Sequence, residues 1–157
     1  MKDQVAFETT AALDAELLAS IRVEAMRESL ERIGRFDLQR ARERFLSGFS
    51  PAHTRYILVA GERVGFFVVR SDEGALLLEH LYIKPNHQGQ GVGAAVLAEV
   101  FAQADRQACP VRVGALRESD SNRFYARHGF ILVEQGEFDN YYVRPASEAL
   151  GLSANQD

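Results

Sequence analysis

The chain has 157 residues, of which 46% are apolar and 25% charged, and its formal net charge is −4 at pH 7. This length and composition are ordinary for one globular domain, and no apolar run approaches the ~20 residues that a membrane-spanning helix needs. The negative charge argues against nucleic acid as a partner, because neutralising phosphates requires a basic surface. With one cysteine, Cys109, and no secretory-signal pattern at its start, the sequence predicts a cytoplasmic protein without a membrane partner.

The first third of the sequence predicts a short strand and two helices. Residues 5–7 are mostly apolar and suit a strand. Apolar residues then recur at helical spacing from Leu13, with Thr10 as a candidate N-cap. Asp37 is a candidate N-cap for a second helix that extends to about Leu46. Both helices therefore precede the main run of strands.

Three strands are expected in close succession, over residues 56–60, 64–70 and 75–83. The short connections between them contain glycine, which is typical of β-hairpins, so the three strands should form an antiparallel meander. Pro85 ends the third strand, because proline cannot donate to a sheet ladder. An apolar stripe at helical spacing then predicts a helix around residues 96–104.

The last third of the sequence alternates between strands and one helix. Strands are expected at 111–115, 130–135 and 140–145, and a helix at 119–128 is closed by Gly129. The complete order of elements predicts an α+β fold. Its centre is a mixed, mostly antiparallel sheet of about six or seven strands, flanked by about four helices.

The stretch NHQGQGVGAA, residues 86–95, lies between the third meander strand and the following helix. Its glycines, Gly89, Gly91 and Gly93, permit a close approach, and free amides at a helix N-terminus form an anion site. The nucleoside-triphosphate P-loop is excluded, because alanines replace the required Lys-Ser or Lys-Thr. A dinucleotide fingerprint, G-x-G-x-x-A, is met by Gly89, Gly91 and Ala94. However, the loop does not directly follow the strand, and a meander is not a βαβ unit.

The segment LEHLYIKPNHQGQGVGAAVLAEV, followed later by NRFYARHGF, resembles the GNAT superfamily of acetyl-CoA-dependent N-acetyltransferases. The phosphate loop of that superfamily has the form Q/R-x-x-G-x-G/A, which Gln88, Gly91 and Gly93 satisfy. The resemblance covers residues 56–145, including the order of elements. It implies a three-layer α/β/α fold and an N-acetyltransferase activity.

The resemblance implies one N-acetyltransferase domain over residues 1–147. The tail at 148–157 is expected to be frayed, as chain ends commonly are. The resemblance also implies acetyl-CoA as co-substrate and no metal, and the histidines show no ligand spacing. Loop amides would bind the coenzyme pyrophosphate, and the strand before the loop would pair with the pantetheine arm. That strand and the strand at 111–115 would splay apart to admit the arm. The expected coenzyme-binding residues are Leu81, Tyr82, Ile83, Gln88, Gly89, Gln90, Gly91, Val92, Gly93, Ala94, Asn122 and Tyr125.

Tyr125 matches the family tyrosine that lies near the coenzyme sulfur. A phenol, with a pKa around 10, can protonate the departing thiolate, so Tyr125 is the expected general acid. The alternative for Tyr125 is a packing role. The family usually carries an asparagine six or seven residues earlier, where this chain has Ser119 and Glu118. Asn122, one helical turn before Tyr125, is expected to supply that amide instead.

Glu79 is the expected general base, because a carboxylate in an otherwise apolar strand needs a reason. Alternation places Glu79 with Leu81 on one face of the strand and His80 with Tyr82 on the other. Burial would raise the pKa of Glu79, and a chain of water molecules would relay the proton to it. The alternative for Glu79 is a buried ion pair with an arginine of the N-terminal helices. His80 is the reserve base.

The resemblance also implies an acceptor pocket built from the first two helices, a later loop and the last strands. We expect the acceptor to be a primary amine of a small molecule, because the basic cluster at residues 32–44 would repel histone-like tails. The alternative is a catalytically silent acyl-CoA-binding sensor of the same fold. A homodimer through an open sheet edge is a further expectation. Candidate pocket residues are Arg22, Met26, Phe36, residues 49–53, Glu137, Asp139, Tyr141 and Tyr142.

Overall fold

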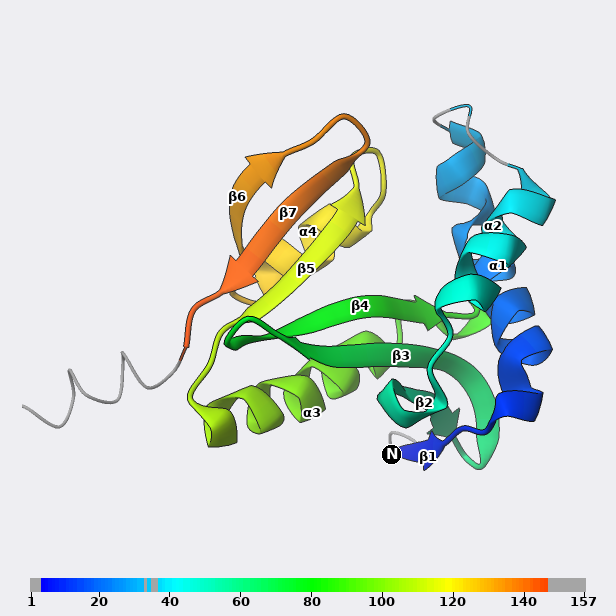
Figure 1. Ribbon diagram of the computed structural model, residues 1–157, viewed down its shortest axis with the longest axis horizontal. Coiled ribbons are helices and arrows are strands. Elements are labelled where there is room, and N and C mark those ends of the chain that lie inside the picture. The colour runs from blue at the N-terminus through cyan, green and yellow to red at the C-terminus, as the bar shows by residue number, and fades with distance from the viewer. Residues whose placement is uncertain (1–3, 33, 35–36, 147–157) are drawn as a thin grey trace, which may run out of the picture. The chain divides into compact units, whose positions relative to one another are not determined.

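The computed structural model describes residues 4–32, 34 and 37–146 (Figure 1). The expectations for Phe36 and for a frayed tail at 148–157 lie outside these residues. Short 3₁₀ turns occur at Ala12–Asp14, Pro51–His53 and Pro85–His87. The helices and strands, in chain order, are β1 (Val5–Thr9), α1 (Ala15–Arg32), α2 (Leu38–Gly48), β2 (Thr54–Val59), β3 (Glu62–Asp72), β4 (Ala75–Ile83), α3 (Val92–Gln107), β5 (Val111–Leu116), α4 (Ser121–Arg127), β6 (Ile131–Gln135) and β7 (Asp139–Arg144).

The predicted α+β class and mixed sheet are confirmed. Within the described residues the strands form one seven-stranded sheet in the order β1-β2-β3-β4-β5-β7-β6. β4 pairs with β5 in parallel, whereas β1–β2, β2–β3, β5–β7 and β6–β7 are antiparallel. The single parallel pair follows from chain order, because α3 crosses over between β4 and β5.

The chain divides into two compact units, which are described separately below. The first unit comprises Met1–Val68 and His80–Val96, and the second comprises Val69–Glu79 and Leu97–Asp157. The β3–β4 hairpin therefore contributes to both units. Its tip belongs to the second unit, whereas the start of β3 and the end of β4 belong to the first.

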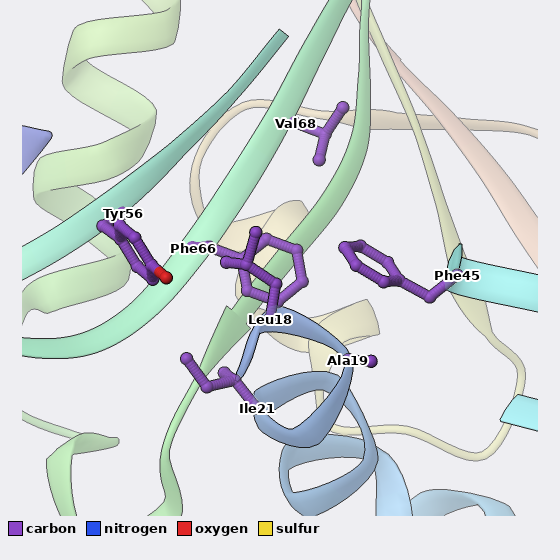
Figure 2. Packing of buried hydrophobic residues seen from close by; sticks show 7 residues of the cluster. All are labelled: Leu18, Ala19, Ile21, Phe45, Tyr56, Phe66 and Val68. Atoms are coloured by element: carbon purple, nitrogen blue, oxygen red, sulfur yellow. The ribbon is translucent and has the colours of Figure 1, made fainter. Parts of the chain in front are cut away.

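In the first unit, α1 and α2 lie side by side and pack their apolar residues against β2 and β3 (Figures 1 and 2). The Phe45 ring meets the Phe66 ring edge-on, with centroids 5.3 Å apart. Burying one such side chain typically contributes about 1.5–3 kcal/mol, so this cluster holds both helices on the sheet. Figure 2 shows its members, Leu18, Ala19, Ile21, Phe45, Tyr56, Phe66 and Val68.

The two helices of the first unit begin differently. Asp37 caps α2 as predicted, because its carboxylate accepts from the Arg40 amide at 3.1 Å. The prediction that Thr10 caps the first helix is wrong. The Thr10 hydroxyl donates instead to the carbonyls of Pro51 and Thr54, and this ties the start of the helical region to the loop before β2.

In the second unit, β5 buries every second side chain and β7 contributes two buried residues to the same core. Aromatic rings join this core to the helices. Tyr125 of α4 lies with its ring centroid 5.3 Å from that of Phe130, and the Phe101 ring of α3 lies 5.7 Å from Phe130. β6 ends the sheet order and is exposed along its whole length. The buried residues of β5 and β7 are Val111, Val113, Ala115, Asn140 and Tyr142.

Candidate active site

The glycine loop connects β4 to α3 and is exposed from Gln88 to Gly91. The Gln88 side chain donates to the Ile83 carbonyl at 2.8 Å and thereby fixes the loop to the end of β4. Gly89 and Gly91 have positive φ angles of 76° and 84°, a conformation that costs other residues about 1–2 kcal/mol. A Cβ on Gly89 would meet no atom within 4 Å, so this position needs glycine for its backbone angles and not for space.

The loop presents free amides at the start of α3. The first bond of the helix runs from the Ala95 amide to the Gly91 carbonyl at 3.2 Å. Among the hydrogen bonds of the described residues, none is donated by the amides of 89–94. The Gln88 amide, which was expected to join them, donates to the Pro85 carbonyl at 3.3 Å instead. Unpaired amides and the positive end of a helix dipole make the stretch 89–94 an anion-binding surface.

Gly65 of β3 is a positioning residue that sequence reasoning missed. A Cβ at this position would lie 2.1 Å from the Tyr82 carbonyl oxygen, closer than any real contact. The Lys84 amide donates to the Val64 carbonyl at 2.8 Å, so β4 stays in register past Tyr82. A glycine in a strand interior often marks such a close backbone approach, and this signal was present in the sequence.

The parallel ladder between β4 and β5 is short. It comprises three residue pairs, from Leu76–Val111 to Leu78–Val113. Both strands continue beyond it, β4 to Ile83 and β5 to Leu116. The splay of the two strands that the family resemblance implies stays a prediction.

The burial predicted for Glu79 is wrong. Its side chain is 33% exposed, and both carboxylate oxygens accept from Arg70 Nε at 3.1 Å. The ion pair proposed as the alternative does exist, but Arg70 comes from β3 and not from the N-terminal helices. The Arg70–Glu79 pair has the geometry of an ordinary, partly solvated salt bridge.

His80 and Tyr82 share the other face of β4, as the alternation predicted. His80 Nδ1 lies 3.0 Å from the Tyr82 hydroxyl. Arg22 of α1 donates from Nε to the same hydroxyl at 3.3 Å and from a terminal nitrogen to the Ala41 carbonyl of α2 at 2.6 Å. Arg22, expected only as a lining residue, therefore connects both helices to β4.

Asn122 is saturated with hydrogen bonds inside the second unit. Its Nδ2 donates to the carbonyls of Leu116 at 2.8 Å and Ser119 at 2.9 Å, with a longer contact to Arg117. Its Oδ1 accepts from Asn140 Nδ2 and from the Tyr142 hydroxyl, each at 2.8 Å. An amide has two N–H donors and two acceptor sites. The coenzyme contact expected of Asn122 therefore has no free group to make it, and the geometry favours a positioning role.

Tyr125 is buried in α4 with 5% of its surface exposed. Its ring centroid lies 5.3 Å from that of Phe130 and 6.3 Å from that of Tyr142. These contacts fix the ring by packing and place it beside the Asn122 network, since Tyr142 is a member of both. The packing role proposed for Tyr125 is therefore real, and it does not conflict with an acid role.

The sequence model of the acetyltransferase (GNAT) domain matches residues 53–132, which is about half of the 157 residues. The chain belongs to the GNAT acetyltransferases. The matched segment begins at the turn before β2 and ends in β6, so it contains the glycine loop, Asn122 and Tyr125. A comparison with curated proteins finds no match.

Solved structures show the same fold for this GNAT protein. A PaiA N-acetyltransferase from Thermoplasma acidophilum, in complex with coenzyme A, has a TM-score of 0.75 at 14% identity, covering 90% of this chain and 99% of that one. An acetyltransferase from Thermus thermophilus has a TM-score of 0.72 at 21% identity, covering 92% and 99%. The ribosomal-protein-S18-alanine N-acetyltransferase of Escherichia coli has a TM-score of 0.68 at 12% identity, covering 91% and 94%.

The predicted coenzyme residues of this GNAT protein fall into two groups. Leu81 to Ile83 and the loop to Ala94 belong to the first unit, whereas Asn122 and Tyr125 belong to the second. Among the residues that the structure describes, no three His, Cys, Asp or Glu side chains are placed to hold a metal ion. None of the described helices combines the length and low polarity needed to cross a bilayer.

The candidate acceptor residues of this GNAT protein have different surroundings. Met26 is half-buried on α1, and Phe49 packs against the core of the first unit. In the second unit Glu137 is exposed, and Tyr141 is 42% exposed. Tyr142, also expected in the pocket, is instead buried with its hydroxyl donated to Asn122.

Proposed function

We propose that this protein transfers the acetyl group of acetyl-CoA to a primary amine of a small molecule by direct attack. The observation that carries the proposal is the run of amides at 89–94 that donate no hydrogen bond among the described residues, at the N-terminus of α3 and inside the family-matched segment. Such amides suit a pyrophosphate, because they donate to its oxygens while the helix dipole favours its charge. Gln88 supports this role by holding the loop against β4.

In the proposed acyl transfer, β4 binds the coenzyme and stabilises the oxyanion, and α4 supplies the general acid. The backbone of Leu81 to Ile83 holds the pantetheine arm, and an amide near Leu81 stabilises the developing oxyanion. As the amine nitrogen bonds to the acyl carbon, the carbon–sulfur bond breaks. Tyr125 donates its phenolic proton to the departing thiolate, which leaves as the thiol of coenzyme A, and the phenolate then regains a proton from solvent in place of the one that the amine loses.

The charge on α2 supports a small acceptor over a basic protein tail. Arg40 and Arg44 are exposed on this helix, and Arg42 pairs with Glu16 of α1. A surface rich in arginine repels a lysine-rich segment, with the strength set by ionic screening. A neutral or anionic small amine meets no such repulsion.

The decisive experiment measures thiol release from acetyl-CoA across a panel of small amines, together with calorimetric binding of acetyl-CoA. We expect turnover with at least one amine. Tyr125→Phe should lower kcat by about 10²-fold or more, within the usual range for a general acid, and leave acetyl-CoA affinity within about threefold. Gln107→Ala, at an exposed position of the same unit outside the predicted coenzyme and acceptor residues, is the control and should be unaffected.

Each other result contradicts a defined part of the proposal. Binding of acetyl-CoA without acetylation of any amine would indicate the acyl-CoA-binding sensor. Retention of NAD but not of coenzyme A would refute acyl-CoA binding altogether. Turnover of a lysine peptide but of no small amine would refute the small-molecule acceptor.

A further inference from the structure

Two neighbouring residues of β4 compete for the role of proton acceptor, and the structure treats them differently. Both oxygens of Glu79 are held by Arg70 Nε, and the side chain is partly solvated. A carboxylate in this arrangement behaves as a member of an exposed ion pair. His80 instead is half-buried and bonded to a second titratable side chain, Tyr82. The contrast directs attention to the face of β4 that carries His80 and Tyr82.

Chemistry fixes the direction of the bond between Arg22 and Tyr82, whereas the bond between Tyr82 and His80 can run either way. A guanidinium only donates, so the Tyr82 oxygen accepts from Arg22 Nε. The second bond of Arg22, to the Ala41 carbonyl at 2.6 Å, fixes the guanidinium in this position. The Tyr82 hydroxyl then has its own proton to donate, and His80 Nδ1 lies 3.0 Å away. A relay through these groups requires the Tyr82 hydroxyl to donate and Nδ1 to accept, so it requires the neutral His80 tautomer with its proton on Nε2.

The rings of this chain are fixed by apolar neighbours. His80 meets the Phe45 ring of α2 with centroids 5.8 Å apart, and Tyr82 meets the Phe66 ring of β3 at 5.4 Å. The charged group that faces His80 and Tyr82 from α1 is Arg22. The groups that face them from α2 and β3 are the two phenylalanines. Glu79 lies on the opposite face of β4. The two phenylalanine rings lower the local dielectric, and this strengthens the hydrogen bonds that Tyr82 makes with Arg22 and His80.

We propose that Tyr82 and His80 form a proton relay that accepts the proton of the attacking amine, with Arg22 as the residue that orients it. The inference rests on the proposed acetyl transfer. As the amine nitrogen bonds to the acyl carbon, its N–H bond breaks and the proton passes to the Tyr82 oxygen. The original Tyr82 proton passes at the same time to His80 Nδ1, which leaves an imidazolium. His80 then releases a proton to water from its partly exposed ring.

Arg22 contributes to the relay in two ways. Its donated hydrogen bond stabilises negative charge on the Tyr82 oxygen while the two protons move. Its fixed positive charge also disfavours the ammonium form of an acceptor close to Tyr82 and favours the neutral amine, which is the form that can attack.

The relay is tested with Tyr82→Phe, His80→Gln and, as a matched control, Glu79→Gln. Tyr82→Phe and His80→Gln should each lower kcat by about 10²-fold or more and leave acetyl-CoA affinity within about threefold. His80→Gln should also abolish the acidic limb that a histidine base gives to the pH–rate profile. Glu79→Gln should keep the limb and lose less than about threefold in kcat, as expected for a partly exposed pair.

Arg22→Gln tests the positioning role through the same pH profile. Loss of the guanidinium removes the repulsion felt by the protonated imidazole, so the acidic limb should move to higher pH while kcat falls. A purely structural role for Arg22 would lower stability and leave the position of the limb unchanged. Thermal unfolding and acetyl-CoA binding are measured for all four variants, and His80→Asn replaces His80→Gln if the latter does not fold.

A spectroscopic measurement does not depend on turnover. Nitrogen-15 NMR of the imidazole should show His80 with its proton on Nε2 and a hydrogen-bonded Nδ1, and Tyr82→Phe should remove the Nδ1 signature. A proton on Nδ1 would overturn the relay. Loss of the acidic limb in Glu79→Gln but not in His80→Gln would overturn the relay while leaving acetyl transfer intact. Binding of acetyl-CoA by the wild-type protein without any turnover would refute the proposed function itself.

Discussion

Each compact unit contains a network of hydrogen-bonded polar side chains, and the two networks have similar bond lengths but different chemical groups. In the second unit Asn122 bonds to Asn140, Tyr142 and two backbone carbonyls, and every donor and acceptor of its amide is occupied. In the first unit Tyr82 links Arg22 to His80. The network of the first unit contains an imidazole, whereas that of the second contains amides and one phenol.

The difference shows how to separate a network that holds a conformation from one that moves charge. Amide groups do not titrate, so the bonds of Asn122 can only fix the β5–α4 loop and β7 relative to each other. An imidazole takes and releases protons near neutral pH, so a phenol bonded to it has somewhere to send its proton. Bond lengths do not distinguish the two cases, because both networks contain bonds of 3.0 Å or less.

Breaking the saturated network should have the largest effect on stability. Asn122→Ala leaves the Asn140 amide and the Tyr142 hydroxyl without this partner, and each buried unsatisfied group costs about 1–3 kcal/mol. The Leu116 carbonyl keeps the Ser119 amide and hydroxyl as donors. We expect the free energy of unfolding to fall by about 3 kcal/mol or more, measured by urea denaturation. Asn86→Ala, an exposed asparagine before the glycine loop, is the control and should change stability by less than about 0.5 kcal/mol. Equal stability of the two variants would show that the network is not structural.

The fold was predictable from the sequence where local signals dominate. The hairpin turns, the Asp37 cap and the glycine loop all depend on residues close together in the chain, and each is found where the sequence placed it within a few residues. The loop and the aromatic segment of α4 together were specific enough to indicate the family. Such signals report backbone conformation, which neighbouring residues largely determine.

The partners of individual polar side chains were not predictable. Glu79 pairs with Arg70 across a hairpin, and Asn122 gathers groups from two later positions of β7 as well as from its own loop. Thr10 bonds to carbonyls more than forty positions away along the chain. Strand register and side-chain direction decide these choices, and neither can be read from local composition.

A substitution at Gly65, beside the backbone of Tyr82, should have an intermediate effect on the free energy of unfolding. A methyl group at Gly65 would collide with the Tyr82 carbonyl at 2.1 Å, so β3 or β4 must shift. We expect Gly65→Ala to lower the free energy of unfolding by about 1–3 kcal/mol, as overpacking does, and to reduce kcat because Tyr82 moves.

Gly48→Ala is the control for this substitution, because a Cβ at Gly48 meets no atom within 4 Å and its φ angle is not positive. That variant should be neutral or up to about 1 kcal/mol more stable. If Gly65→Ala matches it in stability and kcat, the close approach at Tyr82 has no importance for the network of the first unit.

A third tyrosine, Tyr56, extends the comparison, and its substitution should have the smallest effect on stability at neutral pH. Tyr56 is fully buried in the first unit, and burial, followed by the neighbouring Asp14 carboxylate, raises the pKa of Tyr56 to about 12. The Asp14 carboxylate opposes the loss of the Tyr56 proton and outweighs the Arg63 guanidinium that lies over the same ring. Tyr56 is therefore a buried hydroxyl that keeps its proton.

The raised pKa of Tyr56 has a defined consequence for stability. The folded state prefers the protonated phenol, so this contribution is fully present below the ordinary value near pH ~10 and is lost as the pH rises towards about 12. The free energy of unfolding should fall across this interval in the wild-type protein and fall less steeply in Tyr56→Phe. At pH 7 the substitution should change stability by less than about 1 kcal/mol. Tyr141→Phe, which removes an exposed hydroxyl, should retain the wild-type slope. An identical slope in Tyr56→Phe would mean that this phenol does not titrate with unfolding.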